Sequence, residues 1–174
     1  MKKSILLLMG IFILLCGSAF AQDDYPKAEV FGGFSILSVG SDEDVFSERE
    51  QFYGFQANAA FNVSENFGAV ADFGGQYKNI EDITAHVYEY VFGPRFSLRG
   101  EKATVFGQAL FGGATLGGGG ESINGFAMGF GGGVDVNVSE RLAVRVVQFD
   151  WIPTRFEGEW NNNTVRFGFG IVIK

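Results

Sequence analysis

Residues 52–63 read FYGFQANAAFNV, and apolar and polar side chains alternate along most of this stretch. One parity carries only apolar or aromatic side chains, whereas Gln56, Asn58 and Asn62 fall on the other parity. Because successive side chains of an extended strand point to opposite faces, the pattern predicts a β-strand with one apolar and one polar face. The apolar parity consists of Tyr53, Phe55, Ala57, Ala59, Phe61 and Val63.

The same alternation recurs along the chain between polar or glycine-rich segments. It predicts eight strands of about ten residues each, the length that a tilted strand needs to cross a membrane. In the seventh strand the parity slips near Val147, which indicates a β-bulge. The predicted strands span residues 28–37, 52–63, 67–77, 86–97, 104–115, 124–138, 141–152 and 164–173.

The predicted connections alternate in length. Those at 64–66, 98–103 and 139–140 are short, and those at 38–51, 78–85, 116–123 and 153–163 are longer and polar or glycine-rich. Short turns at one rim and longer loops at the other are typical of a transmembrane barrel. The predicted fold class is therefore all-β, an eight-stranded antiparallel up-and-down transmembrane β-barrel.

The distribution of charge indicates which face meets lipid. An eight-stranded barrel has little internal volume, so a face rich in Phe and Tyr would be hard to pack inside it. We therefore expect the aromatic face to point outward into lipid, with the charged side chains paired inside as a polar network of the lumen. The eight side chains of this network are Glu29, Asp72, Glu89, Arg95, Asp135, Arg145, Asp150 and Arg166.

The N-terminus has the pattern of an export signal. Lys2 and Lys3 precede an apolar run over residues 5–15, and Ala19 and Ala21 frame an A-x-A cleavage site. This predicts a cleavable signal peptide over residues 1–21, followed by the barrel domain over residues 22–174. Cys16 is expected to leave with the signal peptide, because Leu15 is not the small residue that a lipoprotein signal places there.

The composition supports a β-rich domain and disfavours several classes of protein. Of the 174 residues 26 are Gly and 20 are Phe, and 47% are hydrophobic, too many for a disordered chain. Gly and Phe are weak helix formers, so a helical bundle is disfavoured. The formal net charge is −7, or −9 without Lys2 and Lys3, and it disfavours nucleic-acid partners because phosphate repels it.

Few residues suggest catalysis or ligand binding. His86 is the single His, but no Ser and acid can be assigned to it, so we expect no catalytic site. The acidic residues Asp42, Glu43, Asp44 and Glu48 have no calcium-loop spacing, so we expect a solvated acidic loop and no metal site or cofactor. Gly117–Gly120 lacks the Lys of a phosphate loop and is expected to be a flexible surface loop. Residues 162–164 match the glycosylation triplet, which is common by chance.

Five motifs resemble the OmpA-like outer-membrane β-barrel family in its single-domain bacterial form. The resemblance covers about residues 27–174 and implies a barrel in the bacterial outer membrane. The last strand also resembles the signal read by the barrel-insertion machinery, with Arg166, Gly168, Ile171 and Ile173 in its positions, although the usual aromatic last residue is absent. The five motifs are VFGGFS at 30–35, FGPRFS at 92–97, ALFGG at 109–113, GGGVDV at 131–136 and RFGFGIVI at 166–173.

The expected function is that of a structural outer-membrane protein with a charge-filled, closed lumen and external loops for surface recognition or adhesion. Its expected partners are outer-membrane lipid and the insertion machinery. Three alternatives remain open at this point: a small channel or transporter, a lipid-modifying enzyme that uses His86, and a soluble periplasmic barrel that binds an apolar ligand.

Overall fold

The computed structural model describes residues 25–40, 49–80 and 83–174. The predicted signal peptide, with Ala19 and Ala21, and the acidic residues at 42–44 and 48 lie outside these residues. The described part contains no helix long and apolar enough to cross a membrane.

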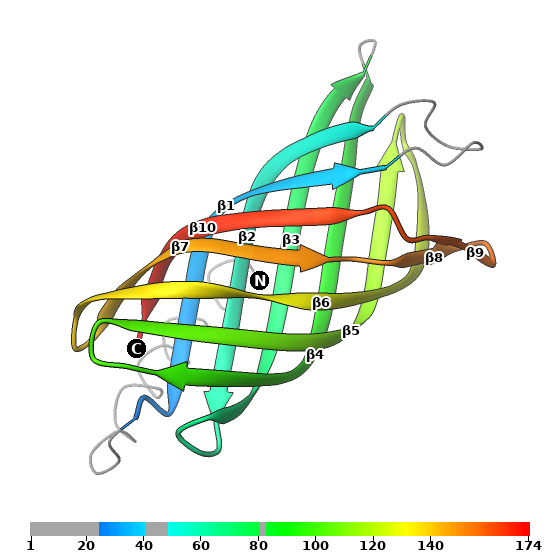
Figure 1. Cartoon of the computed structure of the whole chain (residues 1–174). Coiled ribbons are helices and arrows are strands. Elements are labelled where there is room, and N and C mark those ends of the chain that lie inside the picture. Colours follow the sequence, from blue (N-terminus) through cyan, green and yellow to red (C-terminus); the bar gives the residue numbers. More distant parts are fainter. Residues whose placement is uncertain (1–24, 41–48, 81–82) are drawn as a thin grey trace, which may run out of the picture.

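All eight predicted strands are present, and each pairs with its neighbours in antiparallel fashion (Figure 1). The pairing of the first strand, β1, with the last, β10, closes the sheet into a barrel. Two additional short strands, β8 and β9, form a hairpin that pairs with β6. The strands are β1 (Ala28–Val39), β2 (Glu50–Asn62), β3 (Phe67–Ile80), β4 (Ile83–Arg99), β5 (Ala103–Gly118), β6 (Glu121–Ser139), β7 (Leu142–Trp151), β8 (Thr154–Phe156), β9 (Glu159–Asn161) and β10 (Val165–Ile173).

The strand registers define the stagger of the barrel. A path that starts at Phe126 of β6 and steps to the paired residue on each next strand goes once around the barrel. It returns to β6 at Val136, ten residues further along the strand. With eight strands this stagger corresponds to a strand tilt of about 40°, within the range of transmembrane barrels.

The rim with the longer connections contains more strand than the sequence predicts. Most of the expected loops at 78–85 and 116–123 belongs to extensions of β3, β4, β5 and β6. The prediction of a flexible loop at Gly117–Gly120 is therefore wrong. Gly119 and Gly120 have φ angles of 64° and 94° and make a two-residue turn, which requires positive φ at both positions. The β8–β9 hairpin, which was not predicted, turns in the same way at Glu157 and Gly158.

The predicted bulge in β7 is confirmed. Val147 pairs with Val134 and Arg145 with Asp135, so Val146 is the extra residue of β7. The partners on β10 shift at the same place. Because one residue is inserted, both Arg145 and Gln148 point into the barrel, whereas Val146 and Val147 are exposed.

The outer wall is apolar, and aromatic rings with polar heads gather near the loop-side rim. Tyr53 of β2 lies opposite Tyr77 of β3, whose hydroxyl is 2.9 Å from that of Tyr88. The Tyr53 hydroxyl donates to Gln51, and Trp151 Nε1 donates to the Asn162 carbonyl at 2.7 Å. Rings that lie on apolar surface and hydrogen-bond toward the water side are typical of a membrane-interface girdle.

Candidate functional site

The interior of the barrel is a polar layer, and all eight predicted lumen residues are buried there with at most 5% exposure. Seven of them form one connected group. Glu29 does not join the group and lies toward the rim with the short turns.

Arg166 of β10 is the centre of the group. Its guanidinium is 2.7 Å from Asp72 of β3, 3.0 Å from Glu89 of β4 and 2.9 Å from Asp150 of β7. All of these side chains are at most 1% exposed. The contacts tie β10 and β7 to strands on the other side of the lumen. Gly74 of β3 provides the space, because a Cβ there would run into Glu89 and Arg166.

Arg145 pairs with Asp135 through two hydrogen bonds of 2.7 and 3.0 Å. Its guanidinium also stacks between two aromatic rings, with its central carbon 4.3 Å from the ring centres of both Phe31 and Phe106. Arg95 lies over Phe106 at 4.4 Å. These cation–π contacts place two Phe rings among the charges, whereas most Phe residues were expected on the lipid face.

Amide side chains connect the charged groups. Gln148 accepts from Arg145 at 2.6 Å and donates to Asp150 at 2.6 Å. Gln108 accepts from Arg95 at 2.8 Å and donates to Asp150 at 3.0 Å. Arg95 has no ion pair with any residue in the described ranges, and its side-chain hydrogen bonds go to Gln108 and, at 3.4 Å, to Asn58. A connected, hydrogen-bonded network of this kind is the arrangement that buried charge requires.

Glu29 pairs with Arg99 at 2.7 Å, away from the Arg166 group. Arg99 also donates to the carbonyl of Glu65 in the β2–β3 turn. Arg99 lies in the turn predicted at 98–103, so its pairing with Glu29 was not predicted. Arg99 lies on the same face of β4 as Arg95. This shared parity could have predicted that the Arg99 side chain points into the barrel.

A cluster of buried apolar side chains, which we call the apolar plug, lies at the loop-side end of the interior, and the residue pattern did not predict it. The plug packs above Glu89, and the cavity left between them is about 40 Å³, the size of a single water. Its buried members are Leu37, Phe52, Val87 and Ile152, with Val39, Ala85 and Leu116 packed against them.

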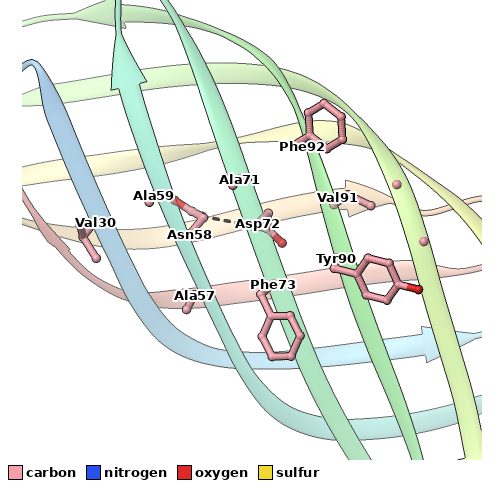
Figure 2. Close-up of a pocket in the computed structure, with 12 residues that line it drawn as sticks. Val30, Ala57, Asn58, Ala59, Ala71, Asp72, Phe73, Tyr90, Val91 and Phe92 are labelled. Atoms are coloured by element: carbon pink, nitrogen blue, oxygen red, sulfur yellow. Dashed lines mark hydrogen bonds between the residues drawn. The ribbon is translucent and has the colours of Figure 1, made fainter. Parts of the chain in front are cut away.

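A hollow of about 720 Å³ lies on the outer wall (Figure 2). Its floor is formed by the small outward side chains of Ala57, Ala59 and Ala71, and Phe73 and Phe92 flank it. Asn58 and Asp72 also border it, but they hydrogen-bond to each other on the inner side of the wall. The hollow is a depression of the lipid-facing wall, and its outward side chains include no acid or base.

The other candidate residues lie apart from the network. The His86 ring contacts the Tyr88 ring, with 5.0 Å between the ring centres, at the loop-side rim. In the triplet at 162–164 the two Asn residues are exposed, whereas Thr164 is buried. No group of three or more His, Cys, Asp or Glu in the described part is placed to hold a metal ion. On β10, Arg166 and Gly168 face the lumen, and Ile171 and Ile173 face outward.

Two of the solved structures that match this chain have a similar barrel. The crystal structure of Ail, the attachment invasion locus protein of Yersinia pestis, matches with a TM-score of 0.56 and 17% identity over 84% of this chain and 96% of that chain. The crystal structure of neisserial surface protein A (NspA) matches with a TM-score of 0.66 and 9% identity over 87% of this chain and 99% of that chain. No protein-family model matches the chain, and no curated protein does. The chain therefore has the fold of the eight-stranded outer-membrane β-barrels, the fold that its resemblance to the OmpA-like family implies.

Proposed function

We propose that the chain is a structural barrel of the bacterial outer membrane, exported through the signal at residues 1–21, and that its loop-side end binds partners outside the cell. The apolar outer wall is suited to outer-membrane lipid. We also propose that Arg166, Gly168, Ile171 and Ile173 of β10 are read by the insertion machinery, since their placement gives the last strand one polar and one apolar face.

The observation that carries this proposal is the filled interior. The Arg166 group and the apolar plug occupy the lumen, and a barrel of eight strands has little further volume for a water-filled path. A closed lumen leaves the exposed ends of the barrel as the places where a partner can bind. No enzymatic role is proposed.

The β8–β9 hairpin offers a structured surface at the loop-side end. We call the group of Phe126, Arg155 and Trp160 the hairpin platform. The rings of Phe126 and Trp160 meet edge to face at 6.2 Å, and Arg155 lies 5.9 Å from the Trp160 ring. Pairing of Arg155 with Phe126 fixes the hairpin to β6. An exposed aromatic ring that is already held in place offers contact area with little loss of entropy on binding.

The charge at this rim suggests the chemistry of the partner. A second Ail structure contains the heparin analogue sucrose octasulfate, a polyanion. Here the described loop-side residues include the acids Glu50, Glu121, Glu157 and Glu159 and the bases Arg49, Lys78 and Arg155, and the whole chain has a formal net charge of −7. We therefore propose a neutral or basic surface as the partner and not a sulfated polysaccharide.

Adhesion of cells that display the chain tests the proposal. Cells of a non-adherent bacterial host should be retained on a coat of reconstituted basement-membrane matrix and not on immobilised heparin. Trp160→Ser should reduce retention about tenfold, the effect of losing about 1.4 kcal/mol of binding free energy. Glu140→Ser at the opposite rim is the control and should change nothing. Retention on heparin, or equal retention of both variants, would contradict the proposal.

A further inference from the structure

The carboxyl group of Glu89 differs from the other acids of the Arg166 group. Its Oε2 accepts from Arg166 at 3.0 Å and from Gln76 at 3.4 Å. Its Oε1 is buried and has no hydrogen-bond partner among the residues that the structure describes. A buried carboxylate oxygen without a donor is unfavourable, because it has lost its water and gained nothing in exchange.

The neighbouring acids are fully satisfied. Asp72 accepts from Arg166 on Oδ1 and from Gln56 and Asn58 on Oδ2. Asp150 accepts from Gln108 on Oδ1 and from Gln148 and Arg166 on Oδ2. Both oxygens of each aspartate therefore have at least one donor, whereas Glu89 Oε1 has none.

The charges of the described interior do not balance if every acid is ionised. Glu29 pairs with Arg99 and Asp135 with Arg145, and three acids share Arg166. With Arg95 included, five carboxyl groups face four guanidinium groups. Uncompensated charge in a buried site is unfavourable, so one more positive charge, or one fewer carboxylate, is expected there.

The surroundings of Glu89 indicate whether a cation is added or a carboxylate is neutralised. The 40 Å³ cavity above it is bordered mostly by apolar side chains, including Leu37, Phe52 and Val87. The other lining side chains with oxygen atoms are Thr154 and Thr164. A metal cation prefers more oxygen ligands than these, whereas a proton needs a single oxygen.

We propose that Glu89 is a proton-binding site and is a neutral carboxylic acid in the folded barrel. The proton comes from solvent and sits on Oε1, which becomes a donor toward the cavity, while Oε2 still accepts from Arg166. The interior then holds four carboxylates and four guanidinium groups. The charged groups that face Glu89 are Arg166 of β10, Asp72 of β3 and Asp150 of β7, and on its other side lies the apolar plug.

Infrared spectroscopy of the folded full chain at neutral pH tests the proposal, in vesicles of ether-linked phosphatidylcholine, whose lipids have no ester carbonyl to overlap the band. We expect the C=O stretch of a protonated carboxyl group, shifted when Glu carboxyls carry ¹³C and unshifted when Asp carboxyls do. This labelling assigns the band without any mutation. Glu89→Gln should remove the band and keep the urea midpoint of unfolding, whereas Asp150→Asn should keep the band and lower the midpoint.

Three results would overturn the proposal. One is the absence of a protonated-carboxyl band in the unmodified chain. Another is a band that shifts with labelled Asp or survives Glu89→Gln. The third is a band that is absent in sodium chloride and present in choline chloride, because sodium would then be the occupant of the cavity.

Discussion

Replacement of Arg166 by Met tests the energetic centre of the barrel. Arg166 makes ion pairs of 2.7, 2.9 and 3.0 Å with three acids, and all four side chains are at most 1% exposed. Met fills similar volume but leaves the acids without their shared cation. Removal of one partner from a buried ion pair costs about 3–5 kcal/mol, and we expect Arg166→Met to destabilise the barrel by at least this amount.

The assay is urea unfolding and refolding in lipid vesicles, followed by tryptophan fluorescence. Because it needs no insertion machinery, it separates the stability of the barrel from any role of Arg166 in assembly. Phe167→Met on the same strand is the control, since Phe167 is 43% exposed on the lipid face. Addition of Asp72→Asn to Arg166→Met should recover part of the loss by removing one stranded charge. An Arg166→Met barrel within about 1 kcal/mol of the unmodified chain would refute the reasoning.

Three further pairs of variants test the assignment of faces. Phe130→Arg should block insertion into vesicles or lower the free energy of unfolding by about 2–4 kcal/mol, because it places a charge in lipid, whereas Phe130→Leu should insert normally. The fraction of folded protein on an unheated gel measures insertion, and equal insertion of the two variants would contradict the assignment. Gly74→Leu should prevent folding because the side chain meets Glu89 and Arg166, whereas Gly32→Leu should fold, since a Cβ at Gly32 has no neighbour within 4 Å. The refolding yields of the two variants are compared, and similar yields would argue against a packed lumen. Phe52→Ala should lower the free energy of unfolding by about 3–5 kcal/mol because it opens a cavity in the apolar plug, and Phe55→Ala on the lipid face should lower it less. The urea midpoints of unfolding compare the two variants, and the reverse order would place Phe52 outside the barrel.

The parity of side chains was sufficient to predict the strands and the faces. It located all eight long strands, the bulge at Val146–Val147 and the burial of the eight charged residues. It succeeded because a period of two is a local property that each strand shows by itself.

The partners of the charges could not be predicted, because they come from strands far apart in the sequence. Arg166 lies 94 residues from Asp72 and 77 from Glu89, and the barrel closure brings them together. Phe31 and Phe106 have inward parity, but parity alone does not show that guanidinium groups stack on their rings. The turn at Gly119–Gly120 was missed because glycine suits both a flexible loop and a tight turn.

The conductance of planar lipid bilayers containing the purified chain tests the central claim, that the interior is filled, most directly. Folding is checked first by migration on a gel, where the folded barrel should run differently before and after boiling. We expect no stable open channel, because the Arg166 group and the apolar plug fill the lumen. A stable conducting state from the folded barrel would contradict the account and favour a channel or transporter.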